Sequence, residues 1–307
     1  MEFKHIPVLF SETVNSLNIK PDGIYVDGTV GGAGHSREIA SRLKGGRLIA
    51  LDRDPEAIAV ATERLKDLPA TVVESNFRDI DAVLDRLSIK DVDGILLDLG
   101  VSSYQLDNAE RGFSFHNDAA LDMRMSSSGT SAADLVNELD AAALADIFFK
   151  YGEEKFSRRI AERIVNERKV KKIETTLQLA DIIASAVPAA ARRDGHPARR
   201  VFQALRIEVN GEMDSLAEAL DKAFRCLKVG GVLSIITFHS LEDRMVKQHF
   251  RELCTGCTCP PDIPVCVCGK TPRGKLVNKK PIEASSQELA ENPRSRSAKL
   301  RSIVRLK

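Results

Sequence analysis

Gly23-Ile-Tyr-Val-Asp-Gly-Thr-Val-Gly-Gly-Ala-Gly-His-Ser36 is the stretch of the sequence that decides the fold. Residues 24–26 are typical of the end of a short buried strand, and residues 36–43 have the pattern of a helix. Three glycines at a spacing of three occupy the turn between them: Gly28, Gly31 and Gly34. Glycine lets the backbone fold tightly and lets a ligand approach it closely. The stretch therefore predicts a strand, a ligand-binding turn and a helix.

A carboxylate follows at the position where such folds hold a ribose. The second predicted strand, residues 47–52, ends in Asp52, which lies 21 residues after Gly31. An acidic residue about 20 residues beyond the glycines normally binds ribose hydroxyls. Together, the turn, the helix and this acid indicate a cofactor that contains a nucleoside.

The glycine spacing and Asp27 favour S-adenosylmethionine over NAD as that cofactor. Folds that bind dinucleotides use G-x-G-x-x-G, which brings a helix N-terminus to a pyrophosphate. This turn reads G-x-x-G-x-x-G instead. Asp27 ends the first strand, where its charge would repel a pyrophosphate but would suit a ligand with an ammonium group. S-adenosylmethionine has an ammonium group, a ribose and no phosphate.

Strand and helix patterns keep alternating after Asp52. Helical patterns at 55–68 and 80–87 alternate with strand patterns at 70–74 and 94–100. This alternation predicts an α/β fold with a parallel sheet that helices cover on both faces. Ligands on such sheets lie at the carboxyl ends of the strands. Four candidate residues fall at those ends: Asp27, Asp52, Phe77 and Asp98.

A helical insertion is predicted before the next strand, residues 229–237. About 130 residues separate it from the fourth strand, far more than a single crossover helix requires. We therefore expect a discontinuous sheet domain, 1–106 and 207–307, and an inserted helical substrate-recognition domain, 107–206. Helical patterns lie at 132–150, 156–169, 177–186, 198–209 and 216–227, and strands that would close the far edge of the sheet lie at 275–282 and 299–307.

The composition is that of an ordinary soluble globular protein, with 307 residues, 43% hydrophobic and 29% charged. No apolar run approaches the roughly 18 residues that a membrane span needs, and the N-terminus has no signal-peptide pattern. We therefore expect a cytosolic protein. Residues 270–307 carry 11 Lys or Arg against 3 Glu, although the whole chain has a net charge of only +1. Such a basic tail favours a polyanionic partner, with simple solvation as the alternative.

A second basic segment lies near the end of the insertion. Residues 192–206 include five arginines. Arg199 and Arg206 are seven residues apart on a predicted helix, so they share one face. We expect this face to bind nucleic-acid phosphates, and the alternative is a solvated helix face.

An unusual polar loop, residues 98–107, follows the fourth strand. Phe113 and Phe115 come soon after it, and aromatic rings near an active site can stack a flipped base. Packing in the core is the alternative for each ring.

Five of the six cysteines fall within fifteen residues: Cys254, Cys257, Cys259, Cys266 and Cys268. Clustered thiols in a cytosolic protein suggest a structural zinc rather than disulfides. The second half of the cluster lacks the C-x-x-C spacing that is common in zinc sites. Reduced cysteines in a loop are therefore the alternative.

Eight motifs together resemble the MraW (RsmH) family, and the resemblance covers essentially the whole chain. In order, they are His5-Ile-Pro-Val8, Asp27-Gly-Thr-Val-Gly-Gly-Ala-Gly-His-Ser36, Leu51-Asp-Arg-Asp54, Asp98-Leu-Gly-Val-Ser-Ser103, Arg111-Gly-Phe-Ser-Phe115, His196-Pro-Ala-Arg-Arg-Val-Phe-Gln-Ala-Leu-Arg-Ile-Glu-Val-Asn210, Thr237-Phe-His-Ser-Leu-Glu-Asp243 and Asn292-Pro-Arg-Ser-Arg-Ser-Ala-Lys-Leu-Arg301. The resemblance implies a Rossmann-like class I methyltransferase that depends on S-adenosylmethionine. Its implied substrate is the N4 amine of a cytidine in the decoding region of 16S rRNA, within the small ribosomal subunit.

The resemblance also implies a set of cofactor-binding residues. It assigns contacts with the methionine part to Ala33, Gly34 and His35, the ribose to Asp52, the adenine to Phe77, and the rest of the pocket to Asp98 and Gln105. Gln105 enters through the resemblance alone. A non-catalytic RNA-binding protein of ribosome assembly and a nicotinamide oxidoreductase are the competing functions.

Asp98 is the candidate catalytic residue. Cytosine N4 is a poor nucleophile because its lone pair is delocalised, so an acceptor must hold the amine and receive its proton. Many amino methyltransferases place an Asp/Asn-Pro-Pro-aromatic loop after the fourth strand, whereas this chain has Asp98-Leu-Gly-Val. Either Asp98 or a neighbouring loop carbonyl is expected to accept the hydrogen bond. His239 and Glu242 either border the pocket or serve as cap and packing residues.

Overall fold

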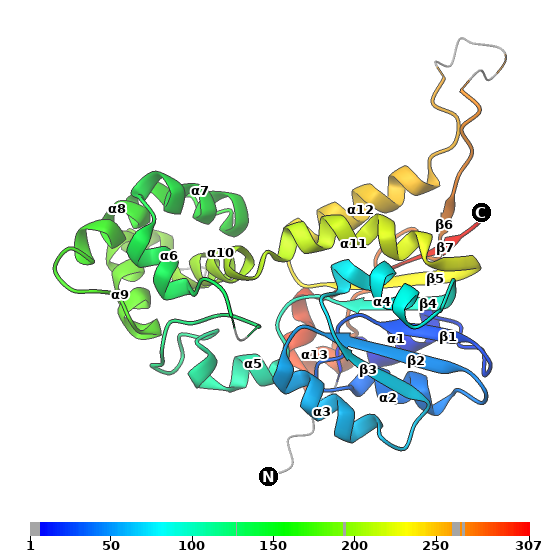
Figure 1. Ribbon diagram of the computed structural model, residues 1–307. Coiled ribbons are helices and arrows are strands. Elements are labelled where there is room, and N and C mark those ends of the chain that lie inside the picture. The colour runs from blue at the N-terminus through cyan, green and yellow to red at the C-terminus, as the bar shows by residue number, and fades with distance from the viewer. Residues whose placement is uncertain (1–6, 127, 193–194, 260–264, 266–267) are drawn as a thin grey trace. The chain divides into compact units, whose positions relative to one another are not determined.

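The computed structural model describes residues 7–126, 128–192, 195–259, 265 and 268–307, which belong to two compact units (Figure 1). The first unit comprises residues 1–100 and 214–307, and the second comprises residues 101–213. The second unit extends beyond the predicted insertion, 107–206, at both ends.

The first unit is built on a seven-stranded sheet in the order β3-β2-β1-β4-β5-β7-β6. Five strands run parallel, and β7 and β6 are antiparallel to their neighbours. The strands are β1 (Ile24–Asp27), β2 (Arg47–Asp52), β3 (Ala70–Glu74), β4 (Val92–Asp98), β5 (Leu227–Thr237), β6 (Gly274–Leu276) and β7 (Lys299–Arg305). The carboxyl ends of β1, β2 and β4 therefore meet along one edge of the sheet.

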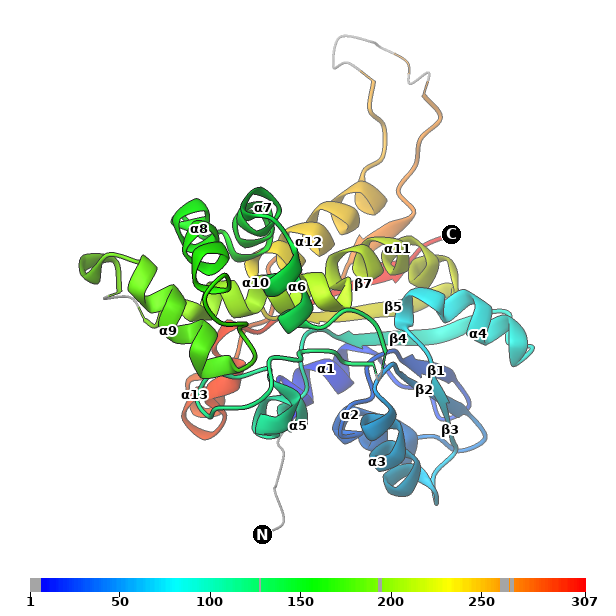
Figure 2. The ribbon, with the colours of Figure 1, turned by 60° about the vertical axis from the view of Figure 1, so that its left-hand side comes forward.

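Helices cover both faces of this sheet (Figures 1 and 2). Side chains alternate between the faces of a strand, and β2 shows the result: Leu48 and Ala50 join one core cluster, while Ile49 and Leu51 join the other. Helices α2 and α3 pack on the first face, and α4, α11 and α12 pack on the second. The helices of this unit are α1 (Phe10–Ser16), α2 (Gly34–Ser41), α3 (Pro55–Leu65), α4 (Ile80–Arg86), α11 (Glu212–Arg225), α12 (Ser240–Cys254) and α13 (Ser286–Glu291), with 3-10 turns at Phe77–Asp79 and Pro293–Ser297. The first two residues of α11, Glu212 and Met213, belong to the second unit.

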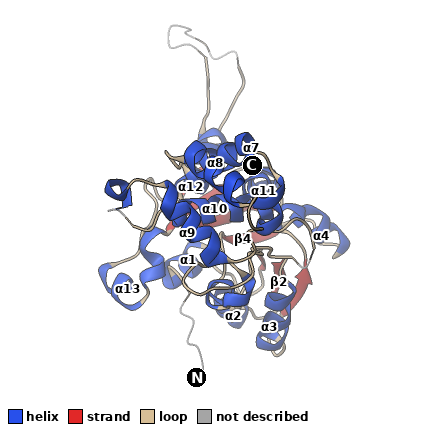
Figure 3. Ribbon diagram, turned by 90° about the vertical axis from the view of Figure 1, so that its left-hand side faces the viewer, coloured by secondary structure: helices blue, strands red, loops and turns tan. Residues whose placement is uncertain are grey.

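The second unit is helical, and its described residues include an isolated bridge between Ala120 and Thr175 but no strand (Figure 3). Its core is apolar and includes Phe148, Ile160, Ile183 and Leu205. A Cβ atom on Gly152 would lie 2.6 Å from the carbonyl oxygen of Arg200, so glycine lets α7 approach α10 closely. The helices are α5 (Ser103–Asp107), α6 (Ala132–Glu138), α7 (Ala141–Gly152), α8 (Ser157–Glu167), α9 (Thr176–Ala186) and α10 (Ala198–Asn210), with 3-10 turns at Ala109–Arg111 and Ala189–Arg192.

The predicted α/β class and strand–helix alternation are confirmed, but two predicted elements are wrong. The helix expected at 132–150 is two helices, because Leu139 is extended and the Asp140 side chain accepts a hydrogen bond from the Ala143 N–H as the cap of α7. The strand expected at 275–282 is limited to β6, followed by a single bridge from Ile282 to Leu300. Pro281 lacks an N–H group, which weakens a strand there.

None of the helices in the described part of the chain is both long enough and apolar enough to span a membrane.

Candidate active site

The glycine turn after β1 is held by the backbones of both neighbouring strands. The Gly28 N–H donates to the Leu96 carbonyl on β4 over 2.9 Å, and the Val30 N–H donates to the Leu51 carbonyl on β2 over 2.8 Å. A Cβ atom on Gly28 would lie 2.5 Å from Leu97 Cδ2, so a side chain cannot fit there without movement. The glycine thus allows the turn to lie directly on the ends of the strands.

Asp52 connects the end of β2 to this turn. Its Oδ2 atom accepts a hydrogen bond from the Gly31 N–H over 2.9 Å, and its Oδ1 atom accepts one from the Asp54 N–H over 3.0 Å. Burial raises the pKa of the carboxyl group above its usual range. A carboxylate has about four acceptor sites, and the backbone N–H groups of Gly31, Asp54 and Arg53 occupy three of them. Acceptor capacity therefore remains for a ribose hydroxyl.

Asp27 stabilises the glycine turn through hydrogen bonds, and its carboxylate is buried rather than open to a ligand. Its side chain is buried and accepts hydrogen bonds from the Ser36 hydroxyl over 2.7 Å and from the Thr29 N–H over 3.1 Å. Burial raises its pKa to about 6. The structure therefore does not support direct contact between Asp27 and a ligand's ammonium group, although its proximity still makes the site acidic.

Asp98 ends β4 and has an unsatisfied side-chain oxygen. Its Oδ1 atom is buried and has no hydrogen-bond partner among the described residues. The pKa of its carboxyl group is raised well above the usual range, first by burial and then by the nearby Asp27 and Glu242 carboxylates. A buried acceptor without a donor is costly, so a ligand that brings a donor or a positive charge would be stabilised here.

Three residues at the start of α2 lie beside Asp98 or the turn. Ala33 adopts a left-handed backbone conformation with φ 61° as the helix cap, and a Cβ atom on Gly34 would lie 2.3 Å from Pro7 Cγ. The buried His35 ring stacks on Phe10, and its Nδ1 atom lies 3.7 Å from Asp98 Oδ2. The turn therefore places an imidazole next to the candidate catalytic carboxylate.

His239 and Glu242 serve as cap residues, one of the two roles expected for them. His239 Nδ1 accepts a hydrogen bond from the Glu242 N–H, and Glu242 Oε2 accepts hydrogen bonds from the N–H groups of Phe238 and His239. This reciprocal pattern is a capping box at the start of α12. Glu242 also contributes to the site, because its charge is one of those that raise the pKa of Asp98.

The two remaining candidate cofactor residues lie in different units. Phe77 begins the 3-10 turn after β3, is partly buried, and packs against the core of the first unit. Gln105 belongs to the second unit, where its side-chain oxygen accepts a hydrogen bond from the Ser102 N–H in a capping box. In the structure, Gln105 therefore stabilises the start of α5.

The two candidate stacking rings differ in exposure. Phe113 is 7% exposed, and the Arg111 guanidinium lies 5.8 Å from the centre of its ring. Phe115 is only partly buried and contacts the rings of His196 and Phe202 at centroid distances of 4.8 and 5.0 Å. Burial favours the packing role for Phe113, whereas Phe115 belongs to a partly accessible aromatic cluster.

The two candidate arginines on α10 also differ. Arg199 is exposed. Arg206 makes two parallel hydrogen bonds of 2.8 Å to Glu212, and the side chains of this pair are only 15% and 11% exposed. The predicted helix is present, but only Arg199 offers an open guanidinium for a phosphate.

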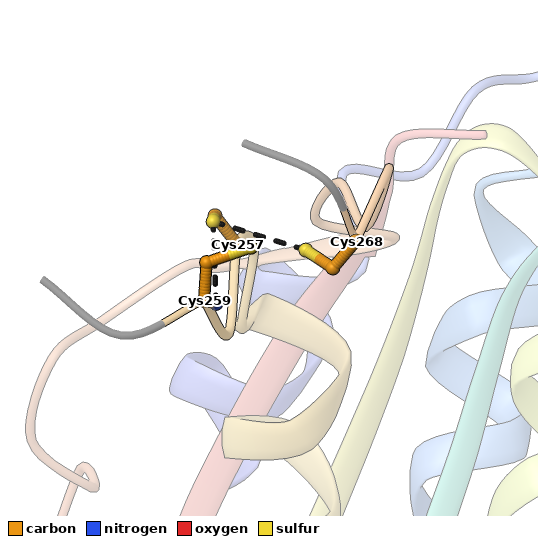
Figure 4. A group of neighbouring side chains, drawn as sticks. All are labelled: Cys257, Cys259 and Cys268. Carbon is orange, nitrogen blue, oxygen red and sulfur yellow. Dashed lines mark hydrogen bonds between the residues drawn. The ribbon is translucent and has the colours of Figure 1, made fainter. Parts of the chain in front are cut away.

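Three of the predicted metal-binding cysteines lie together. The sulfur atoms of Cys257, Cys259 and Cys268 all lie within 4.8 Å of one another (Figure 4). Cys254 ends α12 and packs against the core of the first unit, apart from this group. Cys266 lies outside the described residues.

Sequence reasoning missed two residues that support the site. The Thr29 hydroxyl accepts a hydrogen bond from the Asp98 N–H over 2.6 Å, while the Thr29 N–H donates to Asp27. Thr29 thus links the backbone of Asp98 to the Asp27 carboxylate. Its place inside the glycine turn could have indicated such a role. Phe10, which stacks on His35, lies 25 residues earlier and has no comparable signal.

Comparisons with known proteins agree on the family. A model of the MraW methylase family matches residues 2–306. A protein named ribosomal RNA small subunit methyltransferase H from Clostridium botulinum is 56% identical over 304 residues, which are 98% of each chain. Proteins of the same name are 55% identical in Lachnospira eligens, over 100% of this chain and 99% of the relative, and 52% identical in Symbiobacterium thermophilum, over 100% and 98%. The nicotinamide alternative is therefore excluded, and the chain belongs to the MraW methylase family.

Proposed function

We propose that this chain transfers the methyl group of S-adenosylmethionine to the exocyclic N4 amine of a cytidine in 16S rRNA, in the decoding region of the small ribosomal subunit. The family and the names of the relatives support the reaction class and an rRNA substrate. The observation that carries the proposal within the structure is the unpartnered Oδ1 atom of Asp98, at the carboxyl edge of the sheet beside the glycine turn.

The residues of this edge fit S-adenosylmethionine. Asp52 retains acceptor capacity for a ribose hydroxyl, and Phe77 lies at the end of the next strand, where we place the adenine. Asp27, Asp98 and Glu242 make the site acidic, which suits a cofactor with a sulfonium and an ammonium group. The same acidity would repel the pyrophosphate of a dinucleotide. We assign the methionine part to residues 33–35.

We assign to Asp98 the binding of the target amine and the acceptance of its proton. When bound, S-adenosylmethionine supplies a methyl group on a positively charged sulfur. A positive charge nearby lowers the pKa of a carboxyl group, so Asp98 is more readily ionised in the loaded enzyme than alone. Its carboxylate then accepts a hydrogen bond from the target amine, orients the nitrogen lone pair, and receives the proton that the amine loses.

We assign recognition of the RNA to the second unit. Arg199 supplies an exposed positive charge for a phosphate, and the partly exposed Phe115 supplies a ring on which a nucleobase can stack. Gln105, which the family resemblance assigns to the cofactor pocket, remains a proposal. Because the substrate is rRNA, the proposed reaction takes place in the cytoplasm.

The test is methyl transfer from labelled S-adenosylmethionine to isolated 16S rRNA and to small ribosomal subunits, with the modified base mapped. We expect label in N4-methylcytidine of 16S rRNA. The Asp98→Asn variant is the matched control, since it retains the shape of the site. Binding of the particle without any labelled product would instead favour a non-catalytic assembly factor, and label on another atom or another RNA would contradict the assigned substrate.

A further inference from the structure

We propose that the loop between α12 and β6 binds a structural zinc ion through Cys257, Cys259 and Cys268. This inference goes beyond the methyltransferase activity, and it depends on neither Asp98 nor the cofactor. It rests on how the backbone brings the thiols together, on the distances between their sulfur atoms, and on the different surroundings of the other described cysteines.

The backbone brings two arms of the loop side by side. Leu253, near the end of α12, accepts a hydrogen bond at its carbonyl from the Arg273 N–H over 2.8 Å. Farther along the loop, a Cβ atom on Gly256 would lie 3.2 Å from Pro272 Cδ. Cys257 follows Gly256 on one arm and Cys268 lies on the other, so their proximity follows from backbone contacts as well as from side-chain positions.

The sulfur atoms have the spacing of a tetrahedral zinc site. A zinc–sulfur distance of about 2.3 Å and tetrahedral angles place two thiolates about 3.8 Å apart. Cys268 Sγ and Cys257 Sγ are 3.8 Å apart, and Cys259 Sγ lies within 4.8 Å of both (Figure 4). A disulfide between Cys257 and Cys268 would require their sulfur atoms to be about 2.0 Å apart, much closer than the 3.8 Å between them.

A backbone hydrogen bond also orients one of these thiols. The Cys259 N–H donates to Cys257 Sγ over 3.4 Å. Hydrogen bonds to a sulfur ligand fix its orientation toward the metal. The short Cys-x-Cys spacing produces this contact, because the second cysteine turns its own N–H back toward the first.

The other described cysteines have the properties of inert thiols. Cys226 packs against the core of the first unit, and burial raises its pKa to about 11. Cys254 packs against the same core, and burial raises its pKa as well. Zinc binds the thiolate, so these two cysteines are poorly suited to hold it. The structure thus separates Cys254 from Cys257, although the sequence presents them as a C-x-x-C pair.

Elemental analysis of the full chain, purified under reducing conditions without added metal, tests the proposal. We expect about one zinc per chain. Single Cys257→Ser, Cys259→Ser and Cys268→Ser variants should lose most of it. Cys226→Ser and Cys254→Ala should retain it, and the latter distinguishes the structural grouping from the C-x-x-C motif. Circular dichroism verifies that each variant is folded.

Cobalt substitution gives a second readout that does not depend on the variants. After a chelator has removed the metal from the wild-type chain, added Co²⁺ should produce the thiolate charge-transfer and visible bands of a tetrahedral site. The proposal is overturned if wild-type protein contains no zinc and shows no such bands. It is also overturned if zinc persists in the Cys257/Cys259/Cys268 triple serine variant, or if mass spectrometry finds a disulfide or an iron–sulfur cluster in place of zinc.

Discussion

The Nδ1 atom of His35 lies 3.7 Å from the Oδ2 atom of Asp98. The imidazole ring also stacks on Phe10, with 5.8 Å between the centroids. His35 belongs to α2, which follows the glycine turn, and Asp98 ends β4. The glycine turn, to which we assign cofactor binding, therefore also helps to position Asp98. We assign binding of the target amine to this carboxylate.

Asp98→Asn should separate catalysis from cofactor binding. The amide has the same shape but cannot receive a proton, so we expect the single-turnover methylation rate to fall about 100-fold or more. S-adenosylmethionine affinity should fall by much less, through the loss of one of the acidic groups of the site. Asp91→Asn, just before the opposite end of β4, is the control and should change neither quantity. Equal losses of rate and affinity in Asp98→Asn would show that Asp98 serves only the cofactor.

Asp52→Ala should weaken S-adenosylmethionine binding by about 2–3 kcal/mol, the scale of charge-assisted hydrogen bonds. Calorimetry measures the change. Glu74→Ala is the control, because Glu74 is an exposed acid that pairs with Asp52 across β2 and β3.

Asp52→Asn distinguishes the two roles of this side chain. The amide oxygen can still accept the hydrogen bond from the Gly31 N–H, but the negative charge is lost. If Asp52 binds the ribose hydroxyls through its charge, the Asn variant should lose most of the affinity that the Ala variant loses. Wild-type affinity in the Asn variant would show that Asp52 only holds the turn.

Asp27 should make the ligand-free protein less stable as the pH rises from about 4 to about 7. The pKa of its carboxyl group is raised from 3.8 to about 6 in the folded chain, so folding binds a proton in this range. The stabilisation is complete below pH 3.8 and is lost as the pH rises through 6, by about 3 kcal/mol for this group. Asp52 and Asp98 contribute with the same sign, because their pKa values are also raised.

Asp27→Asn should reduce this pH dependence without removing it. The amide can still accept from Thr29, and the Ser36 hydroxyl can rotate to accept from the amide nitrogen. Denaturant unfolding of the wild type and the variant at several pH values between about 4 and 7 measures the slope. An unchanged slope would contradict the assignment to Asp27.

The sequence predicted the sheet well because its signals are local. The bounds of β2 and β3 match the prediction, since an apolar run ends at an acid in each. Asp52 and Asp98 could be placed at one edge because parallel strands end together. The glycine turn could be recognised because its residues are contiguous.

Contacts between distant segments could not be predicted in this way. The bonds from Arg206 to Glu212 and the stacking of Phe10 on His35 depend on where helices end and how they pack. Cys254 and Cys257 belong to one motif, yet the end of α12 divides them between the core and the exposed loop. In each case the residue type was informative, but the contact depended on tertiary structure.

Phe115→Ala and Phe113→Ala form a matched pair. Loss of a stacking ring should weaken RNA binding by about 1–3 kcal/mol, and we expect this from Phe115→Ala with only about 1 kcal/mol of lost stability. Phe113→Ala opens a cavity in the second unit and should cost about 3–5 kcal/mol of stability. Thermal unfolding and RNA titration measure the two effects. An unchanged RNA affinity in folded Phe115→Ala would exclude the stacking role.

Arg199→Ala and Arg206→Ala should act on different properties, although both residues lie on α10. Arg199 is exposed, so its removal should lower the slope of log RNA affinity against log salt concentration by about 0.7–0.9, as expected for one lost phosphate contact. Stability and S-adenosylmethionine affinity should not change. Arg206 makes two hydrogen bonds to Glu212 and is largely buried, so its removal should cost about 2 kcal/mol of stability and leave the salt slope unchanged.

Glu212→Gln provides the decisive control. If Arg206 is structural, this variant should reproduce much of the stability loss of Arg206→Ala, because it breaks the same ion pair. If Arg206 instead binds phosphate, Glu212→Gln should strengthen RNA binding by releasing the guanidinium.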